Sequence, residues 1–300
     1  MNIFDLQVHS TVSDGKLLPK EVVELAKTRN VKVISLTDHD AVEGIDEALR
    51  VGEEKEIKVI PGIEISVEEH GAHILGYGIN HHNPELLASL SESRQTRIEG
   101  AKQMTENLKN VGFFLEWEDV LKESSGSFVV TRPHIARAIL SNPKNAEKLN
   151  GVNNTHNFID KFLSNESPNY TPRAHIPAKE AIEIIKKSKG VAVWAHPAIH
   201  FSGNYNELEV FLEELISYGL RGIEVFTSAH TEEEAEFIQN LCLVKSLLRT
   251  AGSDFHDPKE YPPDERGLCP ASFVGDYETY GFSTDDIVEN LEKEINKINN

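Results

Sequence analysis

Histidine and carboxylate side chains, both of which bind metal ions, recur in this sequence at the ends of short apolar runs. In the first run, Asp5-Leu6-Gln7-Val8-His9, residues two apart share one face of a strand, so Gln7 and His9 point to the same side. Asp14 follows in a turn-like Ser13-Asp14-Gly15 segment and brings a carboxylate close to the His9 imidazole. An imidazole and a carboxylate placed together indicate the beginning of a metal site.

The same arrangement recurs along the chain, each time at the carboxyl end of an expected strand. It is found at His9, Asp38-His39, Glu64, His196 and Asp254-His256. In parallel α/β folds, and in barrels especially, the loops at that edge converge on the active site. A single histidine beside a strand is more often an ordinary hydrogen-bonded residue, and a single Asp-His pair is more often a helix cap. The repetition at strand after strand favours one shared metal site.

The candidate ligands suit a hydrolytic site with more than one ion. They include no thiolate, which favours manganese, iron or zinc in a hydrolytic site over a structural zinc. The nine candidates are His9, Asp14, Asp38, His39, Glu64, His73, His196, Asp254 and His256. Two or three ions that share a bridging carboxylate would use them, and such sites hydrolyse phosphate esters. We do not include His81 and His82, which precede Pro84 in an expected loop.

The composition limits the possible partners. A net charge of −19, from 49 acidic and 30 basic residues, argues against a broad grip on nucleic acid or on an anionic membrane. The only cysteines, Cys242 and Cys269, give no disulfide framework and no cysteine-based zinc motif. The sequence has no basic leader and no apolar run long enough to span a membrane. We therefore expect a cytoplasmic protein without a membrane partner.

Alternating strand and helix patterns place the candidate ligands. The expected strands cover residues 5–9, 31–37, 58–65, 73–77, 191–195, 222–226 and 247–252, and helical patterns separate most of them. This alternation is typical of parallel βαβ units. From about Pro84 to Pro168 the pattern is helical and shows no convincing parallel strand. We therefore predict a main domain of residues 1–97 and 169–300, with a helical insertion of residues 98–168 over the active site.

Several of these segments resemble the motifs of one family. Asp5-Leu6-Gln7-Val8-His9-Ser10 resembles the Asp-Leu-His-x-His-Ser/Thr opening of the PHP (polymerase and histidinol phosphatase) family. Its remaining motifs are matched by Thr37-Asp38-His39-Asp40, Gly62-Ile63-Glu64, Ala195-His196-Pro197 and Gly252-Ser253-Asp254-Phe255-His256. Three further segments resemble motifs of the stand-alone PHP phosphoesterases: His73-Ile74-Leu75-Gly76-Tyr77, Thr131-Arg132-Pro133-His134-Ile135-Ala136 and Gly222-Ile223-Glu224-Val225. The stand-alone PHP phosphoesterases include enzymes that act on nucleoside 3′,5′-bisphosphates and enzymes that act on the 5′ ends of short RNAs.

The resemblance implies both a fold and a set of ligands. The fold would be α/β, a distorted seven-stranded (βα) barrel of the TIM-like PHP type, with three metal positions on its carboxyl rim. The first ion would be held by His9, Glu64 and Asp254, with Gln7 in the place of the usual histidine. The second would be held by the bridging Glu64 with His73 and His196, and the third by Asp14, His39 and His256. Asp38 would orient a ligating imidazole.

The glutamine at position 7 departs from the family pattern. Its neutral amide oxygen is a weaker ligand than imidazole, so we expect a weakly bound or a harder first ion. Two or three divalent ions are expected, with manganese first and iron, zinc or magnesium as alternatives. Because of this departure, the alternative that the protein is a metal-binding domain without catalytic turnover stays open. A metal-dependent amidohydrolase is disfavoured, because neither a His-x-His start nor a carboxylated lysine is cleanly present.

The resemblance also suggests residues on the substrate side. Arg132 and His134 would reach phosphate from the insertion, although Arg132-Pro133 also suits a solvated helix start. Arg173 and His230 are further candidates for substrate contacts. The expected reaction is direct hydrolysis by a metal-activated hydroxide, with Glu64 as the bridging carboxylate. Arg132 would stabilise the developing charge, and His134 would assist departure of the alcohol.

The expected substrate is small. It is a nucleotide such as a 3′,5′-bisphosphate or the 5′ end of a short RNA, and a sugar or histidinol phosphate is the alternative. The acidic charge fits such a substrate better than a long duplex, and no obligate protein partner is implied. Aromatic residues of the insertion could stack on a nucleotide base, although most of them are expected to pack in a core instead. They are Phe113, Phe114, Trp117, Phe128 and Tyr170.

Overall fold

The structure is a computed structural model, and it describes residues 2–164, 166–171, 176–201, 203–264 and 266–299. The predicted substrate residue Arg173 lies outside the described residues. The strands are β1 (Phe4–Val8), β2 (Val33–Leu36), β3 (Lys58–Ser66), β4 (His73–Tyr77), β5 (Val191–Trp194), β6 (Gly222–Phe226) and β7 (Leu248–Ala251).

Helices separate the strands except between β3 and β4, which only a short 3₁₀ turn joins, and several helices follow one another between β4 and β5. Those associated with the sheet are α1 (Pro19–Thr28), α2 (Ile45–Lys55), α8 (Ala178–Lys187), α9 (Ala198–Phe201), α10 (Tyr205–Tyr218), α11 (Glu232–Lys245) and α12 (Ile287–Asn299). Those between β4 and α8 are α3 (Pro84–Asn110), α4 (Trp117–Glu123), α5 (Arg132–Leu140), α6 (Ala146–Leu149) and α7 (Thr155–Phe158). Local signals fix two of the helix ends: Asn83 caps α3 by accepting bonds from two main-chain amides, and Gly219 ends α10 with a φ of 109°.

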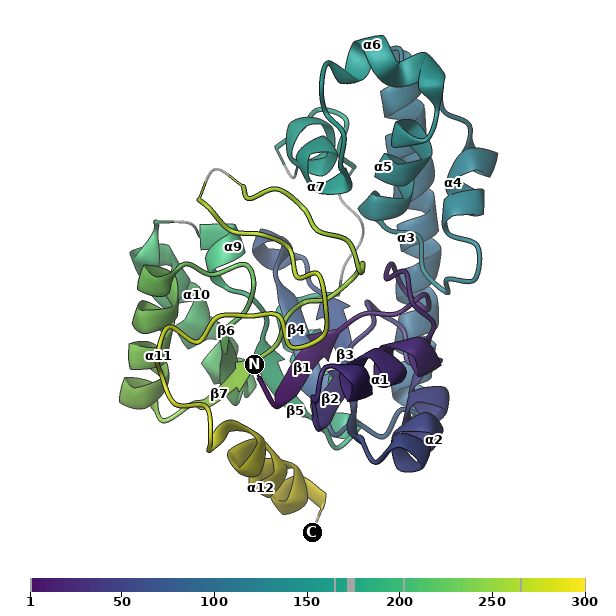
Figure 1. Ribbon diagram of the computed structural model, residues 1–300. Helices are drawn as coiled ribbons and strands as arrows, with labels where there is room; N and C mark the ends of the chain where they lie inside the picture. Colours follow the sequence, from purple (N-terminus) through teal and green to yellow (C-terminus); the bar gives the residue numbers. More distant parts are fainter. Residues whose placement is uncertain (1, 165, 172–175, 202, 265, 300) are drawn as a thin grey trace.

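The described strands form one seven-stranded sheet, in the order β1 to β7, which curls into a nearly closed barrel (Figure 1). β4 is antiparallel to both β3 and β5, whereas the other neighbouring pairs are parallel. The prediction of parallel units is therefore wrong at β4. Only residues 67–72 join β3 to β4, and so short a loop allows a hairpin but not a parallel crossover. Because β4 runs in the opposite direction, its first residue, His73, lies at the edge of the barrel where β3 and β5 end.

Hydrogen bonds between the segment after β7 and the end of β1 connect the two edges of the barrel. The Asp254 amide donates to the Gln7 carbonyl at 3.0 Å, and the His9 amide donates to the Phe255 carbonyl at 2.9 Å. Gly252 permits this close approach, because a Cβ there would lie only 2.5 Å from the Gln7 nitrogen. The closure brings the ligand-bearing ends of the first and last strands together.

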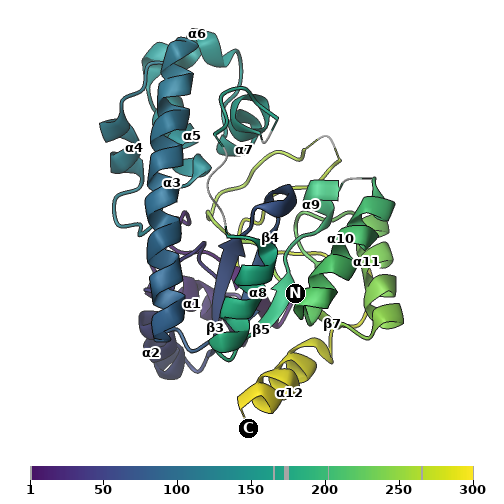
Figure 2. The ribbon, with the colours of Figure 1, turned by 180° about the vertical axis from the view of Figure 1, so that it is seen from behind.

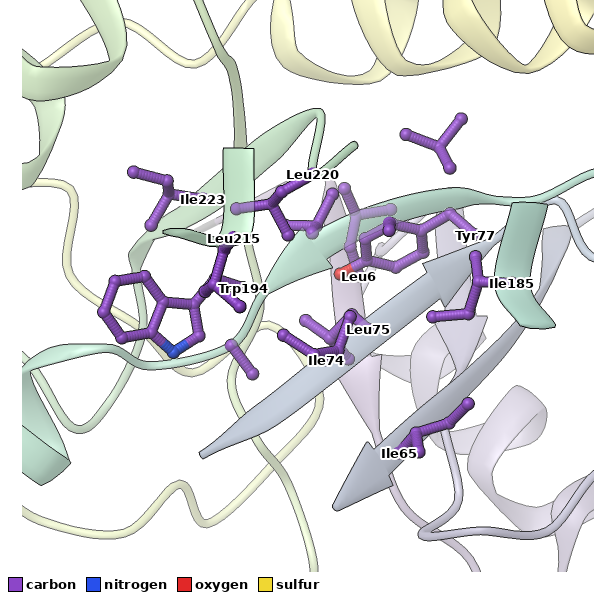
Figure 3. Packing of buried hydrophobic residues seen from close by; sticks show 14 of the residues in the cluster. Leu6, Ile65, Ile74, Leu75, Tyr77, Ile185, Trp194, Leu215, Leu220 and Ile223 are labelled. Carbon is purple, nitrogen blue, oxygen red and sulfur yellow. The ribbon is translucent and has the colours of Figure 1, made fainter. Parts of the chain in front are cut away.

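The main core lies between the sheet and the helices that cover it. Figure 3 shows labelled side chains from four strands and from α8 and α10 meeting there: Ile65, Leu75, Tyr77, Trp194, Ile223, Ile185 and Leu215. Trp194 is completely buried, and its ring meets Phe211 edge-on with centroids 5.3 Å apart. Truncating such an aromatic residue to alanine costs about 3–5 kcal/mol, so this core fixes the barrel that carries the site.

The segment between β4 and α8 builds a second core above the barrel (Figures 1 and 2). The 27-residue α3 takes part in both cores, since Leu86 and Leu90 pack in the first, and Met104 and Leu108 pack in the second. Phe113 also belongs to the second core, whereas Phe114 and Phe128 are exposed. The proposed boundary at residue 98 falls inside the continuous helix α3, and the boundaries at residues 98 and 168 stay a prediction. Although α3 is long, no helix among the described residues is apolar enough to cross a membrane.

Candidate metal centre

The barrel edge collects the predicted ligands from six strands. His9 follows β1, His39 follows β2, His196 follows β5, and both Asp254 and His256 follow β7. Two ligands lie within strands: Glu64 is near the end of β3, and His73 begins β4, as the expected strand over residues 73–77 places it. Glu64 nevertheless reaches the same edge, because β3 continues two residues beyond it to form the hairpin with β4.

The first group of side chains meets around His9. Its Nε2 lies 3.1 Å from both Glu64 Oε2 and Asp254 Oδ1. None of these three atoms has a hydrogen-bond partner, although all three are shielded from solvent. Buried polar atoms that converge without hydrogen bonds are otherwise costly, so this arrangement fits a divalent ion.

The second group shares the other oxygen of Glu64. His73 Nδ1 lies 2.7 Å from Glu64 Oε1, and His196 Nε2 lies 3.0 Å from the same oxygen. The two imidazole nitrogens are 3.4 Å apart. Glu64 therefore faces two ligand groups with its two oxygens, which is the geometry that a bridging carboxylate needs.

The third group lies around Asp14. His256 Nε2 is 3.3 Å from Asp14 Oδ1, and His39 Nε2 is 4.0 Å from Asp14 Oδ2. The His9 and His256 rings are stacked with centroids 4.1 Å apart, which places this group directly beside the first. The structure thus brings together all eight predicted imidazole and carboxylate ligands that the resemblance assigns to ions.

The protonation equilibria also suit metal binding. Burial alone would raise the pKa of Glu64, but His39 and His73 hold it well below its usual range. Burial lowers the pKa of the His39 imidazole well below its usual value, which leaves the ring neutral. Burial acts in the same direction on His9, but Asp254 and Glu64 raise the pKa of His9 well above its usual value. A divalent ion at this group would displace that proton.

Gln7 is completely buried, and its main-chain carbonyl accepts a bond from the amide of Asp254, a member of the first group. Neither Oε1 nor Nε2 of its side chain has a hydrogen-bond partner. An unsatisfied buried amide costs about 1–3 kcal/mol, so this side chain has a reason to bind an ion or a water there. The observation fits the predicted weak ligand at this corner.

Asp38 supports a loop rather than an imidazole. Its carboxylate accepts bonds from the main-chain amides and hydroxyls of Ser10 and Ser13, at 2.6 to 3.2 Å. The predicted orientation of an imidazole is therefore replaced by orientation of the turn that carries Asp14. Four acceptor contacts from one carboxylate fix that turn firmly.

Two further buried residues position His196. Glu224, on β6, accepts a bond from the His196 amide at 3.0 Å, and burial raises its pKa well above the usual range. His230 donates from Nδ1 to the Val225 carbonyl at 2.9 Å, and its Nε2 accepts from the Ala198 amide at 3.3 Å. His230 thus has no ring nitrogen to offer a substrate in this conformation. His230 therefore supports the loop after β5, in place of the substrate contact predicted for it.

The substrate residues predicted on α5 have definite partners. The Arg132 guanidinium donates to the Leu163 carbonyl at 3.2 Å and lies 5.5 Å from the Tyr170 ring. His134 Nδ1 accepts from the Thr131 amide at 3.0 Å, so its proton resides on Nε2. Burial, with the Arg137 cation, lowers the pKa of His134 to about 3, which keeps the ring neutral near pH 7.

A cavity of about 610 Å³ opens beside the third group. Its walls include Asp14 and His256 on the metal side, Arg137 on α5 and Tyr261 on the segment after β7. Among the described residues, the wall contains neither Arg132 nor His134. Figure 1 shows the segment after β7 arching over the barrel toward α7. Sequence analysis missed this segment, since no motif or apolar period marks it.

Arg137 and His200 were also missed. The Arg137 guanidinium donates to the Asp14 carbonyl at 3.3 Å, and its Nε lies 3.6 Å from Glu123. His200 lies in α9, four residues after His196, with its ring centroid 5.9 Å from that of His196 and its Nε2 without a hydrogen-bond partner. The four-residue spacing from His196 was the available signal for His200. No comparable signal marked Arg137.

The amino-acid sequence matches a known protein family over more than half of its length. Residues 5–221 match the PHP domain family, which is more than half of the chain. The chain belongs to the PHP domain family. A 3′,5′-nucleoside bisphosphate phosphatase of Chromobacterium violaceum is 30% identical to this PHP protein over 262 residues, covering 85% of this chain and 88% of the relative. A 5′-3′ exoribonuclease of Haemophilus influenzae is 30% identical over 261 residues, covering 85% and 90%.

Solved structures agree with this membership. An amidohydrolase from Chromobacterium violaceum with bound sulfate aligns with a TM-score of 0.81 and 27% identity, covering 98% of this chain and 97% of that chain. A Bifidobacterium adolescentis protein, predicted to be a metal-dependent phosphoesterase, aligns with a TM-score of 0.80 and 26% identity, covering 97% and 96%. The expected PHP-type barrel is confirmed, and this PHP protein is a metal-dependent phosphoric ester hydrolase.

Proposed function

We propose that this PHP protein hydrolyses a phosphate ester of a nucleotide, either a nucleoside 3′,5′-bisphosphate or the 5′ end of a short RNA. The single observation that carries the proposal is the 610 Å³ cavity beside the metal groups. Its volume lies in the range of sites that bind small ligands, and Arg137 and Tyr261 in its wall suit a phosphate and a nucleoside. The names of the two relatives described above are consistent with such substrates.

The three ligand groups are proposed to hold two or three divalent ions, with manganese as the first choice. The ions would be held by the three groups described above, with Gln7 as an additional weak ligand of the first. When bound, such ions lower the pKa of a water molecule and neutralise phosphate oxygens. The neutral His39 ring and the ionised Glu64 and Asp14 carboxylates are in the states that this binding requires.

The chain's own residues perform the remaining tasks. Arg137 is held beside the Asp14 carbonyl, and its planar fork is suited to a phosphate oxygen pair entering from the cavity. Arg132 is proposed to add positive charge from inside the insertion. His134 is neutral near pH 7 and carries its proton on Nε2, 3.5 Å from the Ser127 hydroxyl, so it holds no acidic proton for the leaving alcohol, and a water molecule is proposed to supply that proton instead.

A screen of manganese-reconstituted protein tests the substrate class. The panel contains nucleoside 3′,5′-bisphosphates, 5′-phosphorylated short RNA, mononucleotides, sugar phosphates, histidinol phosphate and p-nitrophenyl phosphate, with amides as a separate arm. We expect the highest kcat/KM for the first two. A preference for sugar or histidinol phosphates would replace the nucleotide assignment, activity on amides alone would contradict phosphoesterase chemistry, and complete inactivity with all ions bound would favour a metal-binding domain.

Arg137→Met sharpens this screen. Losing a bidentate phosphate contact should lower kcat/KM on the preferred nucleotide by about 10- to 100-fold, since charge-assisted hydrogen bonds contribute about 1.5–3 kcal/mol. Arg50→Met is the matched control, because Arg50 lies on the exposed face of α2 and pairs with Glu54. An Arg137→Met enzyme as active as the control variant would remove Arg137 from the substrate site.

A further inference from the structure

A second cluster of metal-binding side chains lies outside the barrel edge, on α2 and on the turn before α3. Asp46 stands in the first turn of α2, and His81 and His82 occupy the turn between β4 and α3. The three residues offer one ligand atom each, all within 4.8 Å of one another. None of them belongs to the three groups around Glu64, and the proposed phosphoesterase reaction does not use them.

Both imidazoles are directed at the same carboxylate oxygen. His81 Nε2 lies 2.9 Å from Asp46 Oδ1, and His82 Nε2 lies 3.4 Å from it. In a tetrahedral zinc site, bonds of about 2.0–2.1 Å place neighbouring ligand atoms roughly 3.3 Å apart. The observed separations are close to that value, so an ion needs little movement of the three side chains.

The turn that carries the histidines is firmly built. The Asn80 amide donates to the Ser188 carbonyl at 2.6 Å, and the Asn80 side chain accepts from the His82 amide at 3.1 Å. Asn83 accepts from Glu85 and Leu86 at the start of α3 and donates to the Lys187 carbonyl. These bonds hold the main chain of both histidines before any ion binds, which lowers the conformational entropy lost on binding.

We propose that Asp46, His81 and His82 form a separate surface site for a divalent transition ion, best suited to Zn²⁺. Two imidazoles and one carboxylate match the ligand preference of zinc, and water from the open side completes the coordination. The His82 and Asp46 side chains are about two-thirds exposed, at 67% and 69%, so an ion can enter without opening the fold. The simpler alternative is that the histidines, when protonated, pair with Asp46 as ordinary surface ions. Two adjacent cations, with ring centroids 4.1 Å apart, would then repel each other.

The site would link two helices of different parts of the molecule. An ion there joins the start of α2 to the start of α3, the helix that extends into the second core. The expected effect is on stability and on the anchoring of α3, because the ion binds the folded chain and not the unfolded one. The proposal is independent of the proposed substrate and fails or succeeds separately from it.

Zinc binding by the full-length protein tests the site. Equilibrium dialysis against Zn²⁺ should show one ion fewer per chain for His82→Ala and for Asp46→Asn than for the wild type. The ions at the barrel edge are common to all three proteins and cancel in the comparison. The zinc-induced rise in the thermal midpoint should also be smaller in the two variants, while kcat with manganese is unchanged.

His70→Ala is the matched control, since it removes an exposed imidazole on the turn between β3 and β4. It should bind as many zinc ions as the wild type. Equal zinc stoichiometry in the wild type, His82→Ala and Asp46→Asn would overturn the proposal and leave an ordinary ion pair. A loss of one ion in His70→Ala as well would show that the counted ion is bound nonspecifically by surface histidines.

Discussion

Arg97, in the middle of α3, forms an ion pair with Asp40, and their side chains are only 2% and 1% exposed. Asp40 directly follows His39 and adopts a φ of 47°. Arg97 also donates to the Ser66 hydroxyl, while Asp40 accepts from the Ser66 amide. Ser66 lies two residues beyond Glu64. The helix that enters the insertion is thus joined to two segments that carry proposed metal ligands.

Breaking this pair should loosen both segments. Arg97→Met leaves the Asp40 carboxylate buried and unpaired, which costs about 3–5 kcal/mol of unfolding free energy. We also expect a higher manganese concentration for half-maximal activity, because His39 and Glu64 lose their support. Urea denaturation and manganese titration of the activity measure the two effects.

Two variants separate support of the ligands from general stability. Arg97→Met with Asp40→Asn removes both charges and keeps a residue that tolerates positive φ, so much of the stability should return. Arg94→Met removes a neighbouring arginine that contacts the Asp40 carbonyl and Glu43 nearer the surface, and it should cost at most about 1 kcal/mol. A normal manganese requirement in folded Arg97→Met would refute the proposed coupling.

Glu64→Gln should lower kcat by orders of magnitude. Its carboxylate lies between two ligand groups and is held ionised by His39 and His73. Glu224→Gln is a matched control, because Glu224 is an equally buried carboxyl group and a glutamine oxygen can still accept the bond from the His196 amide. Steady-state kinetics at saturating manganese would decide the matter. Activity of Glu64→Gln within about tenfold of the wild type, or about 1.4 kcal/mol, would rule out a bridging role.

Gln7→His should strengthen retention of the first ion. The glutamine side chain is buried without a hydrogen-bond partner, two residues before His9 on the same strand face, so an imidazole there is expected to add a stronger ligand. We expect the dissociation constant for that ion to fall by more than about tenfold, comparable to the effect of outer ligand partners. Metal content after dialysis of both proteins measures the change. Identical retention of every ion in the two proteins would refute the expectation.

His134 should make stability depend on pH. Its pKa falls from 6.5 to about 3 on folding, because burial and Arg137 oppose the charged ring. The unfolded chain therefore binds the extra proton, and stability is lost as the pH falls from 6.5 toward 3. At pH 5 the loss from this residue is about 2 kcal/mol, since one unit of pKa corresponds to about 1.4 kcal/mol.

His134→Gln isolates this contribution. A glutamine at this helix position can still accept from the Thr131 amide but cannot titrate. Chemical denaturation at pH 8 and pH 5, both in chelator, should show a smaller acid-induced loss for the variant than for the wild type. Parallel pH profiles of the two proteins would show that His134 does not carry this dependence.

The sequence by itself determined the ligands and most of the elements. Strand patterns are local, so they placed strands such as β5 and β6 close to their observed bounds. Ligand types at strand ends indicated a metal site, because chemistry and local position were sufficient for that inference. The resemblance to the PHP motifs added the prediction that Glu64, His73 and His196 bind one ion together.

Only the tertiary structure decided how distant segments meet. The pairing of β4 with β5, and the contacts of Asp38 with Ser10 and Ser13, followed from packing of the barrel. Arg97 with Asp40, and Asp46 with His81, pair across 57 and 35 positions of the chain. Such pairs depend on loop lengths and on how α3 crosses the barrel, and neither leaves a periodic trace in the sequence.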